Sequence, residues 1–208
     1  MRTRIKICGI TRPEDGLAAA SAGADAIGLV FYAGSPRNIE LAVAREIVAA
    51  LPPLVSVVAL FMNPSRDEVQ RVLSDLAIDV LQFHGSEPAA FCESFPKRYL
   101  KALAMGGGAD PYAQAAEHAQ AAGFLLDSHA PGQQGGSGET FDWDTIPQDL
   151  PKPFLLAGGL SPDNVAEAVR RCRPYGVDVS SGVEAARGIK DPAKLAAFIN
   201  EVNRVGQI

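Results

Sequence analysis

Short apolar, β-rich runs alternate with longer amphipathic or alanine-rich stretches along the whole chain. Within the first run, apolar and polar positions alternate with the period of two that is typical of a strand, so Ile5 and Ile7 share one face and Lys6 and Cys8 the other. Such runs predict eight strands, at Arg4–Cys8, Ala26–Tyr32, Val55–Phe61, Val80–His84, Tyr99–Ala104, Phe124–Asp127, Phe154–Ala157 and Val177–Ser180.

Helix-start signals precede most of the intervening stretches. A capping residue followed by proline or an acidic residue occurs in Thr11-Arg12-Pro13-Glu14, Asn63-Pro64, Ser86-Glu87-Pro88, Ser161-Pro162 and Asp191-Pro192. Strands that alternate with helices indicate βαβ units and a parallel sheet. Eight units in 208 residues favour a closed (β/α)8 TIM barrel of the α/β class over an open doubly wound sheet. Because no linker or shift in composition divides the chain, we expect a single barrel domain over residues 1–208.

Composition narrows the functional class. Hydrophobic residues make up 47% of the chain and charged residues 21%, as in soluble globular proteins. A net charge of −5 argues against nucleic acid as a partner, although backbone N–H groups can still bind small anions. The apolar run 51–62 is too short to span a bilayer, and no signal peptide is evident. Three cysteines without metal-ligand spacing predict a reducing, cytoplasmic location, no disulfide framework and no metal site. The oligomeric state is not readable.

The carboxyl ends of barrel strands meet at one face, where such proteins build their active sites. The first strand places Cys8 there, although a free cysteine is also often a small buried hydrophobe. The remaining residues expected at this face are Arg37 after the second strand, Gln82 and His84 at the end of the fourth, Asp127 at the end of the sixth, and Asp178 in the eighth. Arg37 suits a carboxylate or phosphate but could equally be a solvated surface arginine. His118 and His129 receive no role.

Two glycine-containing turns follow the seventh and eighth strands, where TIM barrels commonly bind phosphate. They are Gly158-Gly159-Leu160 and Ser180-Ser181-Gly182. Glycine lets backbone N–H groups approach phosphate oxygens, and the amino terminus of each following helix would add a favourable dipole. Ordinary turn glycines are the alternative for either motif taken alone. Together, after these two strands, they predict a phosphate site built from Gly158, Gly159, Ser180, Ser181 and Gly182.

Asp127 is followed by a long glycine-rich loop, His129 to Phe141. This loop is expected to close over a substrate beside the carboxylate and exclude water. Alternatively, Asp127 is a helix cap or ion-pair partner and the loop a surface excursion without a role.

Seven motifs, in order along nearly the whole chain, resemble phosphoribosylanthranilate isomerase, the (β/α)8 enzyme of tryptophan biosynthesis. They are Lys6-Ile7-Cys8-Gly9-Ile10-Thr11, Ser35-Pro36-Arg37, Gln82-Phe83-His84-Gly85, Leu126-Asp127, Gly135-Gly136-Ser137-Gly138-Glu139-Thr140-Phe141-Asp142-Trp143, Gly158-Gly159-Leu160 and Asp178-Val179-Ser180-Ser181-Gly182-Val183-Glu184. The absence of a second unit resembles the monofunctional form of the family.

The resemblance implies an Amadori rearrangement of a small phosphosugar, N-(5-phosphoribosyl)anthranilate, without cofactor or metal. It implies Cys8 as general base, Asp127 as general acid and Arg37 as the contact for the anthranilate carboxylate. The acid must be protonated, and we expect burial to raise the pKa of Asp127. We further expect the Lys6 ammonium to lower the pKa of the Cys8 thiol. The roles of Gln82, His84 and Asp178 stay open.

Two other readings compete with this one. A different phosphosugar isomerase or epimerase would place a histidine, a carboxylate pair or a metal set at the strand ends instead of Cys8 and Asp127. A non-catalytic phosphate-ligand binding barrel would keep the glycine turns but lose the acid and the base.

Overall fold

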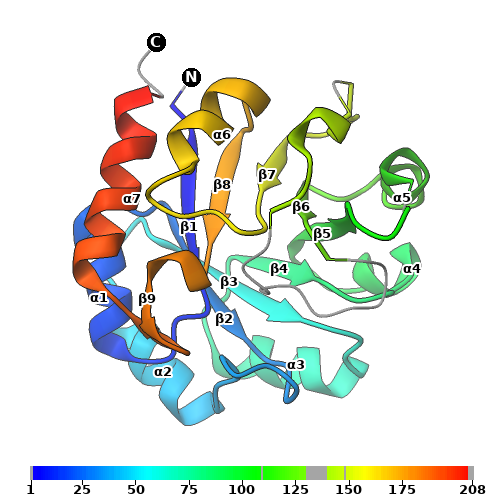
Figure 1. Cartoon of the computed structure of the whole chain (residues 1–208). Helices are drawn as coiled ribbons and strands as arrows, with labels where there is room; N and C mark the ends of the chain where they lie inside the picture. The colour runs from blue at the N-terminus through cyan, green and yellow to red at the C-terminus, as the bar shows by residue number, and fades with distance from the viewer. Residues whose placement is uncertain (1, 109, 130–139, 148, 206–208) are drawn as a thin grey trace.

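The eight predicted strands are present and form a closed parallel barrel in which each strand pairs with its neighbours in chain order (Figure 1). The computed structural model describes residues 2–108, 110–129, 140–147 and 149–205. The barrel strands are β1 (Arg4–Cys8), β2 (Ala26–Val30), β3 (Ser56–Phe61), β4 (Val80–Phe83), β5 (Arg98–Ala104), β6 (Gly123–Asp127), β7 (Phe154–Leu156) and β8 (Gly176–Val179). Several strands end one or two residues earlier than predicted, so His84 and Ser180 lie in the loops just beyond them.

Helices surround the barrel. They are α1 (Pro13–Ala22), α2 (Leu41–Ala50), α3 (Arg66–Asp75), α4 (Ala89–Cys92), α5 (Pro111–Glu117), α6 (Val165–Cys172) and α7 (Pro192–Val205), with short 3₁₀ turns η1 (Trp143–Thr145) and η2 (Ser181–Val183). The last helix, α7, packs against both α1 and α6 and so joins the two ends of the chain (Figure 1). Among the described residues, no helix has the length and apolar character needed to cross a bilayer.

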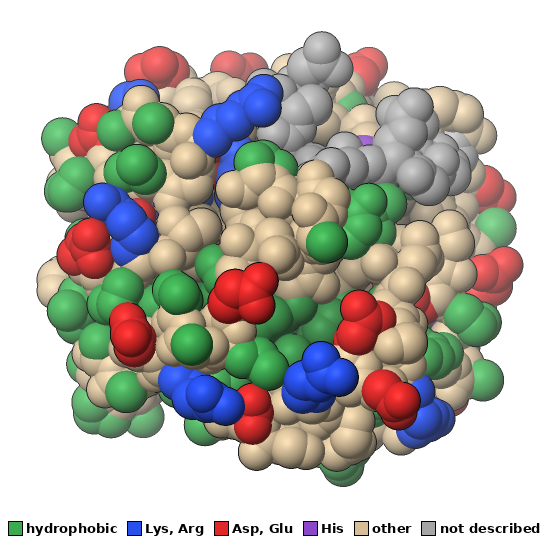
Figure 2. Space-filling model, turned by 90° about the horizontal axis from the view of Figure 1, so that it is seen from below, with side chains coloured by type: hydrophobic (Ala, Val, Ile, Leu, Met, Phe, Trp, Pro, Cys, Tyr) green, Lys and Arg blue, Asp and Glu red, His purple; other side chains and the backbone are tan. Residues whose placement is uncertain are grey.

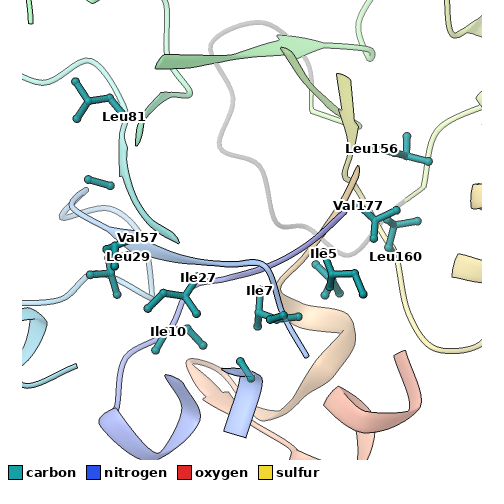
Figure 3. Close-up of a cluster of buried hydrophobic side chains, with 14 of the residues drawn as sticks. Ile5, Ile7, Ile10, Ile27, Leu29, Val57, Leu81, Leu156, Leu160 and Val177 are labelled. Atoms are coloured by element: carbon teal, nitrogen blue, oxygen red, sulfur yellow. The ribbon is translucent and has the colours of Figure 1, made fainter. Parts of the chain in front are cut away.

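The alternation predicted for the first strand is confirmed. Ile5 and Ile7 lie on the outer side of the barrel, in the apolar layer between strands and helices (Figure 3). Lys6 and Cys8 therefore project into the barrel. Ala102, Leu125 and Ala157 form a separate small cluster of buried apolar side chains.

The helix-start predictions succeed only in part. Asp191 accepts hydrogen bonds from the first turn of α7, as expected (2.8 Å from the Ala193 amide). Ser65, rather than Asn63, caps α3 and forms a capping box with Glu68. The expectation that Thr11 caps α1 is wrong, because its hydroxyl donates to the carbonyl of Gly188 instead.

Two connections depart from the repeating βα unit. In the described part of the β6–β7 connection, the regular structure is the single 3₁₀ turn η1, so the expected helix is missing there. Glycine, proline and aspartate dominate this connection, and these residues disfavour a helix interior. Between β8 and α7, the antiparallel hairpin β9 (Glu184–Ala186) and β10 (Ile189–Lys190) was not predicted. The hairpin lies beside the start of α1, where the Lys190 amide donates to Asp15 Oδ2 at 3.0 Å (Figure 1).

Candidate active site

A pocket opens at the carboxyl ends of the barrel strands and gathers most of the residues that the sequence singled out. The predicted residues that line it are Cys8, Arg37, Gln82, His84, Asp127, Gly158, Gly159, Asp178, Ser180 and Ser181. Lys6 lies deeper in the barrel, and Gly182 lies behind the Ser180–Ser181 turn. Parallel strands bring these distant segments to one edge because every carboxyl end faces the same way.

Cys8 lies beside a buried ion pair. Lys6 Nζ donates to Asp178 Oδ1 at 2.7 Å, and the two side chains are 2% and 9% exposed. Burial raises the pKa of the Cys8 thiol, Lys6 lowers it and Asp178 raises it, and the net direction is upward. The expected direction of the Lys6 effect is therefore present. Burial and Asp178 outweigh this effect, and neither could be read from the sequence.

Gly28, which the sequence analysis missed, makes room for this group. It stands opposite Cys8 in the β1–β2 register. A methyl group placed on its Cα would lie 2.8 Å from Cys8 Sγ and 3.2 Å from Lys6 Nζ. A glycine inside an apolar strand is a signal of such close approach and could have been read from the sequence.

Asp127 is held between two histidines. His84 Nε2 donates to Asp127 Oδ2 at 3.1 Å, and His129 Nδ1 lies 3.5 Å from the same oxygen. The Ser128 amide donates to the other oxygen at 2.7 Å. Burial raises the pKa of Asp127, but the opposing effect of His129 and His84 is larger. The net pKa therefore lies well below the ordinary 3.8. The expectation of a raised pKa is thus wrong here, because the sequence did not show that two histidines converge on this carboxylate.

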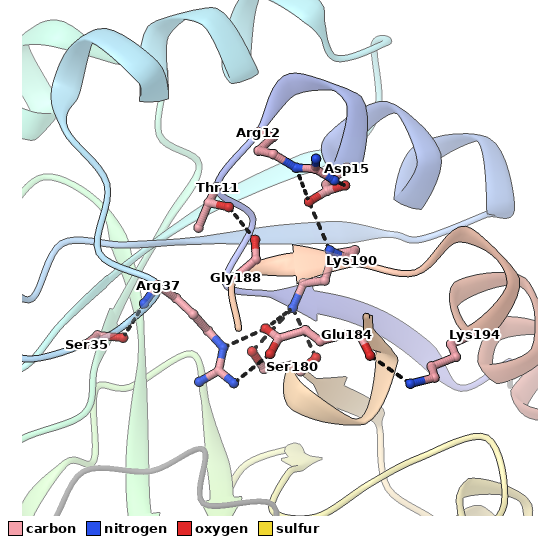
Figure 4. Close-up of polar contacts among 10 residues, drawn as sticks. All are labelled: Thr11, Arg12, Asp15, Ser35, Arg37, Ser180, Glu184, Gly188, Lys190 and Lys194. Carbon is pink, nitrogen blue, oxygen red and sulfur yellow. Dashed lines mark hydrogen bonds and ion pairs between the residues drawn. The ribbon is translucent and has the colours of Figure 1, made fainter. Parts of the chain in front are cut away.

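Arg37 is fixed by a carboxylate that sequence reasoning gave no role. Its Nε and Nη2 donate to Glu184 Oε1 and Oε2 at 2.7 and 3.0 Å (Figure 4). Lys190, fully buried, donates to the same Glu184 at 3.0 Å and to the carbonyl of Ser180 at 3.0 Å. The hairpin β9–β10 therefore ties Arg37 to the turn after β8. Arg37 is buried and does not sit as a solvated surface arginine.

The two glycine turns lie against each other. Gly158 and Gly159 adopt left-handed backbone angles (φ +82° and +64°), and a Cβ on Gly158 would meet the Ser128 amide at 2.8 Å. Gly182 packs directly on the carbonyl of Leu160. The element directly after β8 is the three-residue turn η2, and the expected helix, α7, begins only at Pro192, so no long helix dipole adjoins Ser180–Gly182. Gly158, Gly159, Ser180 and Ser181 all line the pocket.

The opposite wall of the pocket is apolar. Val30, Leu60 and Met62 line it, together with Tyr32. These positions were not predicted, because one apolar strand-end residue looks like any other in a sequence. A flat aromatic group fits such a wall, while charged ends of the same molecule fit Arg37 and the glycine turns.

The sequence predictions also concern the loop after Asp127, the surface charge and the cysteines. The glycines of the predicted lid, Gly132 to Gly138, lie outside the described residues. On the face of the molecule in Figure 2, Lys and Arg side chains are interspersed with Asp and Glu. All three cysteines are free thiols.

Comparison with known proteins identifies the family of this chain. The model described as N-(5'phosphoribosyl)anthranilate (PRA) isomerase matches residues 5–201. A protein of Pseudomonas fluorescens with the name N-(5'-phosphoribosyl)anthranilate isomerase is 57% identical over 201 residues, which are 97% of this chain and 96% of that protein. The crystal structure of phosphoribosyl anthranilate isomerase from Thermotoga maritima superposes with a TM-score of 0.88 at 39% identity, covering 96% of this chain and 98% of that one.

A further solved structure contains a ligand. It is phosphoribosyl anthranilate isomerase in complex with reduced 1-(o-carboxyphenylamino)-1-deoxyribulose 5-phosphate. Its TM-score is 0.83 at 36% identity, with 96% of this chain and 98% of that chain covered.

Proposed function

The chain belongs to the family of N-(5'-phosphoribosyl)anthranilate isomerases, enzymes of tryptophan biosynthesis, and we propose that in this reaction Cys8 is the general base and Asp127 the general acid. The main support for this proposal is the position of Cys8 and Asp127. Both line one pocket at the carboxyl ends of β1 and β6, between Arg37 and the glycine turns. A base at the end of β1 and an acid at the end of β6 can reach the C2 hydrogen and the ring oxygen of one bound sugar.

The reaction begins with ring opening. Asp127 gives a proton to the ring oxygen of the phosphoribosyl group, the C1–O bond breaks, and an imine forms between C1 and the anthranilate nitrogen. The lowered pKa of Asp127 opposes this step in the ligand-free pocket. The substrate itself brings a carboxylate and a phosphate, and nearby negative charge raises the pKa of a carboxyl group. His84 Nε2 lies 3.1 Å from Asp127 Oδ2, so it is placed to hold the carboxyl group at that oxygen.

The second step needs the thiolate of Cys8. It removes the C2 proton, and the electron pair moves into the imine to give an enolamine, which tautomerises to the ketone. The imine nitrogen is the electron sink, so the residues of this pocket suffice for the chemistry. Lys6 supports the step because its ammonium favours the thiolate over the thiol, against burial and Asp178.

The remaining pocket groups hold the two ends of the substrate. Arg37 Nε and Nη2 are engaged with Glu184, so the other terminal nitrogen, Nη1, is the one to meet the anthranilate carboxylate. The aromatic ring rests against Val30 and Leu60. The phosphate lies against the backbone of Gly158, Gly159, Ser180, Ser181 and Gly182.

A turnover assay tests the assignment. Freshly generated phosphoribosylanthranilate is mixed with the purified protein, and loss of substrate fluorescence is followed for wild type, Cys8→Ser and Asp127→Asn. We expect each variant to lose about 10²- to 10⁴-fold in kcat while its thermal unfolding stays cooperative. Cys172→Ser, on α6 and away from the pocket, is the matched control and keeps wild-type turnover.

Other outcomes would support a competing reading. A wild-type chain that binds the phosphosugar tightly without turning it over would be a phosphate-ligand binding barrel. Full activity of either site variant would remove that residue from the mechanism while leaving the family assignment in place.

A further inference from the structure

Three side chains with metal-ligating atoms meet at one point of the pocket wall. His84, Asp127 and His129 each offer one ligand atom, and these atoms all lie within 4.8 Å of one another. Asp127 Oδ2 is the shared centre, 3.1 Å from His84 Nε2 and 3.5 Å from His129 Nδ1. Two imidazoles and a carboxylate are a donor set that also holds catalytic zinc in enzymes.

One of these atoms is incompletely satisfied. The His129 side chain is 5% exposed, and its buried Nδ1 lies 3.5 Å from Asp127 Oδ2 but forms no hydrogen bond of normal geometry with the described residues. A second buried polar atom without a hydrogen-bond partner among the described residues is Gln82 Oε1. A buried polar atom without a partner is unfavourable, and native structures usually satisfy it with protein, water or an ion. The His129 nitrogen is aimed at Asp127 Oδ2, where a cation would be shared.

The distances fit a small divalent ion. Ligand atoms bound to Zn²⁺ at about 2.0–2.1 Å in a tetrahedron lie about 3.3–3.4 Å apart. The separations of 3.1 and 3.5 Å bracket this value. The third separation, between the two histidine nitrogens, is at most 4.8 Å and would have to shorten when an ion binds. The two rings are already in contact, with centroids 4.8 Å apart.

The groups behind the ligands are arranged as an outer shell. The Ser128 amide holds Asp127 Oδ1 at 2.7 Å and leaves Oδ2 for the ion. Gln82 Nε2 lies 3.2 Å from His84 Nδ1. With the Gln82 amide turned over, its orphan Oε1 would accept the Nδ1 proton that His84 carries when Nε2 binds a metal. Such contacts orient ligands and raise affinity.

We propose that His84, Asp127 and His129 form an inhibitory binding site for Zn²⁺, with water in the fourth position. Two imidazole nitrogens select zinc-class ions over Mg²⁺ or Ca²⁺, which prefer oxygen ligands. A second cavity, lined by His84 and His129 but by neither Cys8 nor Asp127, borders the cluster. Binding of the ion rests only on this geometry. Inhibition additionally rests on the proposed function, because an ion on Asp127 Oδ2 blocks the acid.

The binding test uses tag-free protein and two metals. Co²⁺ is titrated and its visible absorption recorded, since tetrahedral nitrogen and oxygen ligation gives a characteristic intense band, and Zn²⁺ affinity is measured by calorimetry. We expect one ion per chain in wild type. His129→Gln and His84→Gln should each weaken binding by at least about tenfold. His118→Gln is the control, because His118 is a buried histidine that contacts Tyr99 outside the cluster.

Thiol binding is separated by a second control. Cys8→Ser should leave the Co²⁺ band unchanged, whereas a band that disappears with Cys8 would place the ion on sulfur and overturn the proposal. Equal affinity in wild type and in both histidine variants, with cooperative unfolding retained, would also overturn it, as would absence of the band in wild type.

The activity test then separates the two claims. Turnover of wild type should fall as Zn²⁺ saturates the site and return on addition of a chelator. Half-inhibition of His129→Gln, measured against its own metal-free rate, should need at least about tenfold more Zn²⁺ than half-inhibition of wild type. Saturated but fully active protein would retain the binding site and refute both the inhibition and the role of Asp127 as the acid. Absence of binding with normal turnover would refute the site and leave the proposed function intact.

Discussion

Replacing Lys6 with methionine removes the cation from the buried centre beside Cys8. In the wild type, Lys6 Nζ is 2.7 Å from Asp178 Oδ1 and both side chains are almost fully excluded from water. Loss of one partner from a buried pair leaves the other charge uncompensated, which typically costs about 3–5 kcal/mol. We therefore expect the free energy of unfolding of Lys6→Met to fall by about 3–5 kcal/mol, a large part of the stability of a typical domain.

The same substitution changes the reactivity of Cys8. Lys6 lowers the pKa of this thiol and Asp178 raises it. Lys6→Met should therefore raise the pKa of Cys8, Asp178→Asn should lower it, and the double variant should move back toward wild type. Each 1.4 kcal/mol of lost thiolate stabilisation slows alkylation at neutral pH about tenfold.

Two assays check this pair of effects. Urea unfolding gives the stability of the two single variants and the double variant, and the double variant should recover most of the loss because no unpaired charge is left. Alkylation followed by peptide mass spectrometry gives the rate at Cys8 separately from Cys92 and Cys172. An unchanged Cys8 pKa in Lys6→Met, or shifts of equal sign in the two single variants, would refute the electrostatic account.

Two further substitutions test the ends of the pocket. Gly158→Ala should destabilise the protein and raise KM, because its φ is +82° and the new Cβ meets the Ser128 amide at 2.8 Å; Gly108→Ala, with φ +73° and open space, should lose only about 1–2 kcal/mol. Glu184→Gln should raise KM more than it lowers kcat, because Arg37 loses the charged partner that holds it. Steady-state kinetics gives KM and kcat for these variants, and thermal unfolding gives their stability. An equal loss of stability in the two glycine variants, or an unchanged KM for Glu184→Gln, would contradict the roles assigned to Gly158 and Glu184.

The fold could be predicted because its signals are local. A period of two in Ile5–Cys8 places Ile7 outside the barrel and Cys8 inside. The alternation of eight short strands with helix-start signals gives the parallel barrel. The strand-end residues of the site followed from this, since parallel strands share one carboxyl edge.

The contacts that tune the site are not local. Lys6 and Asp178 are paired through closure of the barrel between β1 and β8, and their contact depends on strand register. Glu184 reaches Arg37 through a hairpin that the sequence did not reveal. His129 has no pattern that distinguishes it from any loop histidine, although its position beside Asp127 reverses the expected pKa shift.

The division of labour between Asp127 and Cys8 is tested most directly by a kinetic isotope effect with substrate deuterated at C2. Cys8→Ser should slow removal of the C2 proton and so show a large primary isotope effect on kcat. Asp127→Asn should slow ring opening, which breaks no bond to that hydrogen, so its isotope effect should be close to unity. The reverse pattern, or the same isotope effect in both variants, would contradict the assignment of base and acid.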